Sequence, residues 1–159
     1  MDHKKLARWL KAAVIIIALC LAVIYFMVIP SMGRSLADAN PEFAYCFWPW
    51  MVFIWITAVP VYAALIFCWR LARGIGLDRP FTRQNAENCK WISALAILDS
   101  VYFFVGNVLL LFLNMNHPGI LLASLLVVFA GAAIAIAFGA LSNLVGRAAT
   151  LQEQSDLTI

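Results

Sequence analysis

The chain has 159 residues, of which 65% are hydrophobic and only 12% are charged, and its formal net charge is +3. Ordinary globular proteins are about half apolar and about a quarter charged, so this composition argues against a soluble protein. The length allows one domain, and we expect an all-α integral membrane protein with no second soluble domain.

Four apolar stretches are long enough to cross a bilayer as helices. A membrane helix needs about 20 mostly apolar residues, because the hydrocarbon layer is about 30 Å thick and each residue rises 1.5 Å. In chain order the predicted spans are residues 9–29, 47–69, 91–113 and 120–145. They predict a membrane four-helix bundle, with residues 146–159 as a tail.

The first span follows a basic segment and ends at Pro30. A basic start also fits a signal peptide, but the apolar stretch is too long and no A-x-A-like cleavage site follows it. We therefore expect the span to be retained. In the second span, Pro60 removes one helical hydrogen bond and predicts a kink, with the Thr57 hydroxyl as a candidate partner for the released carbonyl.

Basic residues predict the orientation, because they stay on the cytoplasmic side. They gather before the first span and between the second and third spans, whereas the loop between spans three and four has none: Lys4, Lys5, Arg8, Lys11, Arg70, Arg73, Arg79, Arg83 and Lys90. Tryptophans at the predicted span ends mark the same two interfaces. Both termini and the middle loop are therefore expected in the cytoplasm.

The third helix is expected to begin in the cytoplasm with Thr82 as its N-cap and to enter the membrane near Trp91. Asp99 lies inside its span, where a charged group must face the bundle, water or a partner. With Asn107 it forms a candidate ion or proton site. The alternative is a buried hydrogen bond, for which Ser93, Ser100 and Asn143 are candidate partners.

The fourth helix carries small residues at four-residue spacing, namely Gly131, Ala135 and Gly139. Such a stripe lets helix backbones approach closely in lipid, within the chain's own bundle or against a second copy. The apolar periodicity of this helix continues past the membrane into the tail. The tail is a candidate docking segment for a cytoplasmic protein; the alternative is that it packs on the chain's own basic loop.

The sequence offers no catalytic set, so we do not expect an enzyme. The predicted interior has one carboxylate and no histidine, too few groups for intramembrane hydrolysis. No cofactor or metal site is predicted. The four cysteines lie in or beside apolar segments, where they behave as small hydrophobic residues: Cys20, Cys46, Cys68 and Cys89.

Two short stretches resemble a bacterial membrane family, catalogued as domain-of-unknown-function family 2975. They are Arg79-Pro80-Phe81-Thr82 with Asn85, and Leu151-Gln152-Glu153 with Asp156-Leu157-Thr158-Ile159. Many members have a glutamate where this chain has Gln84. The resemblance implies a four-helix protein of the bacterial inner membrane without assigned catalysis, often encoded beside a helix-turn-helix regulator of the Cro/CI type.

These features lead to one main functional hypothesis, a regulatory or scaffold protein that binds a soluble cytoplasmic partner and makes no direct contact with nucleic acid. The Cro/CI-type regulator is the partner that the resemblance implies. The predicted docking residues are Arg79, Phe81, Thr82, Asn85, Gln152, Glu153, Asp156, Leu157, Thr158 and Ile159. The alternatives are a small transporter or channel subunit that uses Asp99 and Asn107, in an oligomer, and an accessory subunit that docks in the membrane on the small-residue stripe.

Overall fold

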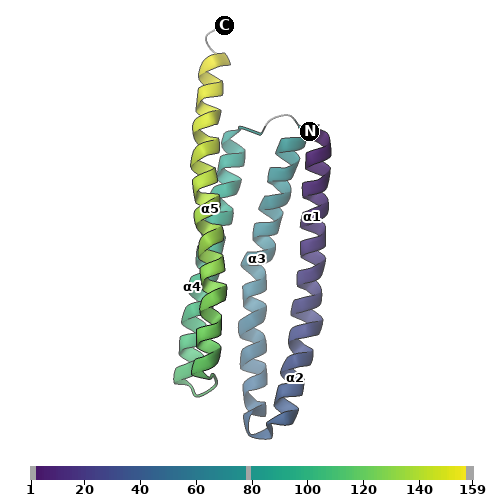
Figure 1. Ribbon diagram of the computed structural model, residues 1–159, viewed down its shortest axis with the longest axis vertical. Helices are drawn as coiled ribbons and strands as arrows, with labels where there is room; N and C mark the ends of the chain where they lie inside the picture. The colour runs from purple at the N-terminus through teal and green to yellow at the C-terminus, as the bar shows by residue number, and fades with distance from the viewer. Residues whose placement is uncertain (1–2, 78–79, 157–159) are drawn as a thin grey trace.

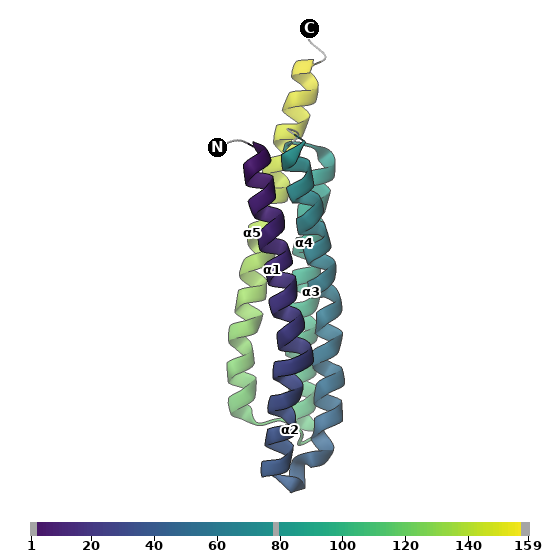
Figure 2. The ribbon, with the colours of Figure 1, turned by 90° about the vertical axis from the view of Figure 1, so that its right-hand side faces the viewer.

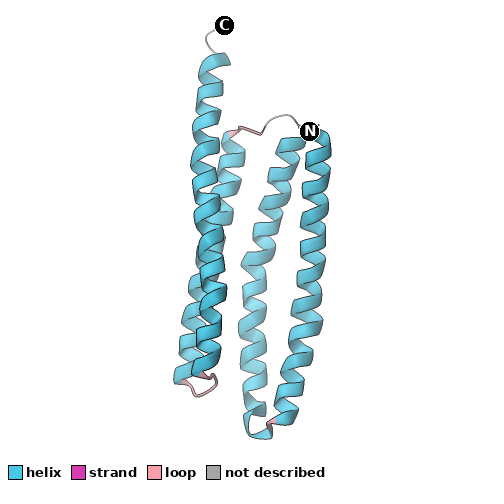
Figure 3. Cartoon of the chain, viewed as in Figure 1, coloured by secondary structure: helices cyan, strands magenta, loops and turns pink. Residues whose placement is uncertain are grey.

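The computed structural model describes residues 3–77 and 80–156, and within those ranges every regular element is helical. The chain forms four long rods that run alternately up and down (Figures 1 and 3). Each rod contains a stretch long and apolar enough to cross a membrane. The predicted all-α fold with four membrane-length helices is therefore confirmed.

The first rod is longer than the sequence predicted. It consists of α1 (His3–Val23), a π-helical segment (Ile24–Val28) and α2 (Ile29–Ala39). The helix continues past Pro30, the predicted end of the first span, because Pro30 lies in the first turn of α2, where a proline ring is tolerated. Just before it, the Ile29 N–H bonds to the Ile24 carbonyl, five residues back. The Tyr25 carbonyl accepts a hydrogen bond from the Trp55 indole at 3.1 Å, so this backbone group has a partner from the next rod.

The second rod contains a 3₁₀ segment (Pro41–Cys46) and α3 (Phe47–Gly76), which continues through Pro60. Loss of the Pro60 N–H leaves the Ile56 carbonyl without its usual helical donor. The Thr57 hydroxyl does not serve that carbonyl. It donates to the Ile54 carbonyl at 2.6 Å and pairs with the Tyr25 hydroxyl at 2.9 Å, which links the first two rods.

The third and fourth rods are α4 (Arg83–Phe112) and α5 (Pro118–Asp156). Thr82 is the N-cap of α4, as predicted, and its hydroxyl oxygen accepts the Asn85 N–H at 3.2 Å. α5 has 39 residues and continues well beyond the ends of α1 and α3 (Figures 1 and 2).

The rods pack in chain order, so that α3 lies between α1 and α4, and α4 lies between α3 and α5. Within the described parts of the chain, α5 does not pack against α1 or α3. Many large apolar side chains are therefore exposed in the isolated chain; Phe112 is 79% and Ile136 is 74% exposed. A lipid environment would cover such side chains, because the bilayer core is as apolar as they are.

The small-residue stripe of α5 faces α4 of the same chain. A Cβ on Gly131 would meet the Ser100 side chain, and one on Gly139 would lie 3.3 Å from the Ser93 hydroxyl. The carbonyl of Ala135, between them, accepts a hydrogen bond from Ser93 at 2.7 Å. The stripe thus serves close packing within the chain, and α4 covers it.

Candidate functional site

The N-terminus, the α3–α4 connection and the C-terminal end of α5 lie at one end of the molecule, which we call the terminal end (Figure 1). A layer of aromatic and basic side chains crosses the helices near it. The Lys11 ammonium lies 5.4 Å from the Trp69 ring centroid, and the Arg70 guanidinium lies 5.5 Å from that of Phe67. Phe67 stacks on Trp91 of α4, with ring centroids 6.1 Å apart. This combination is typical of a membrane–water interface.

Two of the predicted docking residues, Thr82 and Asn85, hold the start of α4. Thr82 caps the helix, while the Asn85 amide donates to the Pro80 carbonyl at 3.0 Å. The Asn85 side chain is buried and lies against Gly74, where a Cβ would approach it within 2.6 Å. Gly74 thus leaves room for Asn85 to join the end of α3 to the start of α4.

An ion pair joins α4 to the last turns of α5. The Arg83 guanidinium donates to both carboxylate oxygens of Glu153, at 3.1 and 2.8 Å. Both side chains are mostly exposed, at 70% and 51%, so the pair adds about 1 kcal/mol at most to stability. Its bidentate geometry nevertheless orients this part of α5 relative to α4. The tail is therefore packed, in part, on the basic loop of its own chain.

Beyond this ion pair, the terminal end exposes large apolar side chains. Leu77 is 66%, Phe81 is 51% and Leu151 is 66% exposed, and Gln152 is exposed beside Leu151. Asp156 is the last residue of α5. The other predicted docking residues lie outside the described ranges: Arg79, Leu157, Thr158 and Ile159.

Asp99 is half-buried in α4, and its Oδ1 atom is buried with no hydrogen-bond partner among the described residues. The expected bonds to serines are absent there, since Ser93 donates to Ala135 and Ser100 to Ala96. The described ranges contain no group of three or more His, Cys, Asp or Glu able to hold a metal ion.

Asn107 is fully buried and belongs to a different contact. Its amide donates to the Phe103 carbonyl at 2.8 Å, and its Oδ1 accepts the Asn116 amide at 3.1 Å. Asn116 also donates to the Asn107 carbonyl at 3.2 Å. These bonds attach the α4–α5 connection to α4. The structure does not bring Asn107 into contact with Asp99.

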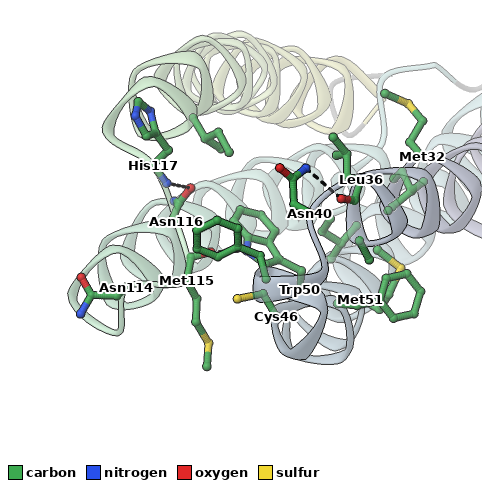
Figure 4. Close-up of a pocket in the computed structure, with 17 residues that line it drawn as sticks. Met32, Leu36, Asn40, Cys46, Trp50, Met51, Asn114, Met115, Asn116 and His117 are labelled. Carbon is green, nitrogen blue, oxygen red and sulfur yellow. Dashed lines mark hydrogen bonds between the residues drawn. The ribbon is translucent and has the colours of Figure 1, made fainter.

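The sequence analysis missed a cavity at the opposite end of the molecule, between the α2–α3 hairpin and the α4–α5 connection (Figure 4). Its volume is about 570 Å³. Its lining combines residues far apart in the chain, such as Leu36, Trp50 and Met115. The one available signal was a cluster of Asn, His and Pro in the α4–α5 connection, which indicates a turn and not a site.

The comparisons with known proteins agree with a membrane location. The chain is 26% identical over 153 residues to a protein of Bacillus subtilis (strain 168) described as an uncharacterized membrane protein, YoaS. The similarity covers 95% of this chain and 96% of that protein. No solved structure matches the chain. With its four helices of membrane-spanning length, the chain is a multi-pass membrane protein.

Residues 31–159 match the family described as Protein of unknown function (DUF2975), and the chain belongs to that family.

Proposed function

We propose that this protein is a membrane-bound docking protein that binds a soluble cytoplasmic protein at its terminal end. The observation that carries the proposal is the exposure of Leu77, Phe81 and Leu151, which lie at the end of α3, just before α4 and in the last turns of α5. Leu151 lies in the last two turns of α5, the helix that continues beyond the ends of α1 and α3 (Figure 1) and, with the predicted orientation, into the cytoplasm. An apolar patch in water, rimmed by charged residues, is typical of a protein-binding surface.

The distribution of charge supports a cytoplasmic position for this surface. The basic residues of α1, α3 and α4 gather at the terminal end, and such residues are retained on the cytoplasmic side. The Arg83–Glu153 ion pair orients the last turns of α5 relative to α4, so that the partner meets a formed helix. The partner class implied by the family resemblance is a helix-turn-helix regulator of the Cro/CI type. The chain would then affect transcription through its partner, without touching DNA and without catalysis.

Leu151→Ala, compared with Leu144→Ala, tests the docking surface. Both leucines are 66% exposed and lie seven residues apart on one face of α5, but Leu144 is two turns closer to the membrane. Truncating a leucine at the centre of an interface costs about 1 kcal/mol, or about fivefold in affinity.

The two variants and the original protein are purified in lipid nanodiscs, and the bound cytoplasmic proteins are identified and quantified by mass spectrometry. We expect one specific soluble partner, whose recovery falls about fivefold with Leu151→Ala and is unchanged with Leu144→Ala. Equal recovery with both variants would place the contact elsewhere. If the original protein retains no soluble partner, the docking function is refuted.

The unpaired carboxylate oxygen of Asp99 favours a second candidate, proton or cation transport. A carboxylate inside a membrane span is costly unless it is neutralised or binds a cation. This candidate predicts that Asp99→Asn abolishes flux in reconstituted vesicles while the protein stays folded, whereas Ser100→Ala, one residue on, retains flux. Absence of flux with the original protein, or unchanged flux with Asp99→Asn, would exclude it.

A further inference from the structure

The cavity at the end opposite the terminal end has two distinct walls. α2 and the start of α3 form one wall, and the α4–α5 connection with Ile120 of α5 forms the other. In Figure 4 the labelled side chains of Leu36, Asn40 and Trp50 lie on one side, and those of Asn116 and His117 on the other. The volume of about 570 Å³ lies within the range of about 300–1,000 Å³ that is typical of small-molecule sites.

Contacts between different parts of the chain fix the positions of the two walls. The cavity is therefore present without a ligand. The Trp50 indole donates to the Met115 carbonyl at 2.7 Å and thereby joins α3 to the α4–α5 connection. That connection is also tied to α4 by the bonds between Asn116 and Asn107. On the α2 side, a Cβ on Gly33 would lie 3.1 Å from the Phe47 ring, so this glycine permits close contact of α2 with α3.

The chemistry of the walls selects an apolar, uncharged ligand. Among the described residues, none that lines the cavity is charged. Arg34 and Asp38 of α2 line a separate depression. A charged group inside would be desolvated without a counter-charge, which is very unfavourable. Met32, Met51 and Met115 contribute flexible thioethers, which adapt to apolar groups of varied shape.

Two polar atoms at the exposed rim complete the site. The Gly119 N–H donates to His117 Nδ1 at 3.1 Å, so neutral His117 carries its proton on Nε2 and can donate from there. The Asn40 amide nitrogen donates to the Leu36 carbonyl at 3.1 Å, and within the described ranges its Oδ1 accepts no hydrogen bond. A hydroxyl group at the rim can donate to Asn40 Oδ1 on one wall or accept a hydrogen bond from His117 Nε2–H on the other.

We propose that this cavity binds a neutral amphiphile with one hydrocarbon tail and a hydroxyl head group. The tail lies against the apolar walls, and the hydroxyl group binds at the rim, to Asn40 or to His117. The ligand enters from the bilayer, because the cavity lies at the end of membrane-length rods whose apolar surfaces face lipid. This site is independent of partner docking at the terminal end.

Photolabelling in lipid nanodiscs tests the proposal, with a hexadecanol that carries a diazirine group in its tail as the probe. Two competitors have the same tail length: unlabelled hexadecanol and hexadecyltrimethylammonium, which is charged. We expect saturable labelling of peptides from α2, α3 and the α4–α5 connection. Hexadecanol should displace the probe about two- to tenfold better than the ammonium compound, because only its head group can form a hydrogen bond at the rim.

Matched variants distinguish the cavity from the surrounding lipid surface. Ala37 lines the cavity, so Ala37→Phe should fill it and reduce the labelling at least about tenfold. Ala39 lies two residues further along α2 and is exposed outside the cavity, so Ala39→Phe should leave the labelling unchanged. His117→Ala alters only the rim; it should preserve labelling but reduce the preference for the hydroxyl over the ammonium head group.

Three outcomes would overturn the proposal. Labelling that rises linearly with probe concentration would mean ordinary contact with bulk lipid. Equal labelling of Ala37→Phe and Ala39→Phe, with both proteins monodisperse, would place the probe outside the cavity. Cross-links between two copies through the cavity residues would show that a second chain occupies the space.

Discussion

Asn114 closes α4 in a backbone conformation that few residues adopt. Its φ is +55°, the only positive φ among the described non-glycine residues. The Met115 N–H bonds to the Leu110 carbonyl at 2.9 Å and the Asn114 N–H to the Leu111 carbonyl at 3.1 Å, which is a Schellman motif. Asparagine tolerates this region better than other residues with a Cβ. The turn that carries one wall of the cavity thus depends on Asn114.

Asn114→Val should lower the free energy of unfolding by about 1–2 kcal/mol, because a β-branched residue is strained at positive φ. Asn114→Gly should preserve or raise it. Leu113→Val is the control, since Leu113 has a φ of −81°. Denaturant titration in mild detergent measures all three proteins. Equal losses for Asn114→Val and Leu113→Val would show that φ does not limit the stability of this turn.

The helices contact one another at several glycines, and these glycines differ in how much space a Cβ atom would have. Gly106 of α4 lies directly under the Phe53 ring of α3, so a Cβ there would overlap the ring. Phe53 cannot easily move, because it stacks on Phe103 with ring centroids 5.6 Å apart. A Cβ on Gly146 of α5, by contrast, would lie 3.7 Å from the Ala86 methyl group, an ordinary van der Waals contact.

Gly106→Ala should therefore destabilise the protein by about 1–3 kcal/mol through overpacking. Gly146→Ala should stabilise it by up to about 1 kcal/mol, because alanine loses less conformational freedom in a helix than glycine does. Thermal unfolding of both variants in the same detergent measures whether each change lowers or raises the stability. Destabilisation of the same size in both variants would mean that the two interfaces are packed alike.

Within the whole molecule, the features that depend on residues close together in the sequence were predictable from local sequence signals. Apolar length predicts the four helices, because a backbone in lipid must satisfy its own hydrogen bonds. Thr82 was recognised as an N-cap from its position before a periodic apolar run, and the structure confirms it. The small residues of the fourth helix predicted close packing, and in the structure a Cβ on Gly139 would lie 3.3 Å from the Ser93 hydroxyl of α4.

Features that depend on residues far apart in the chain were not predictable. The first helix continues past Pro30, with the Trp55 indole of the next rod bonded to the Tyr25 carbonyl, and no local pattern indicates that bond. The cavity likewise depends on the contact of Trp50 with Met115, which lie 65 residues apart. Asn107 was predicted as an intramembrane polar group, but its bonds to Asn116 give it a role in holding the α4–α5 connection.

The orientation of the whole molecule in the membrane determines which compartment each proposed site faces. The distribution of basic residues predicts that the terminal end lies in the cytoplasm. In a background without the native cysteines, Leu151→Cys and Phe43→Cys introduce single thiols at opposite ends, on side chains that are 66% and 52% exposed. A membrane-impermeant maleimide added to intact cells should label Phe43→Cys at once, but Leu151→Cys only after permeabilisation. The reverse pattern would show that the terminal end faces the outside of the cell, where its exposed leucines cannot bind a cytoplasmic protein. The amphiphile would then enter the cavity from the inner leaflet, so one labelling experiment determines which compartment each site faces.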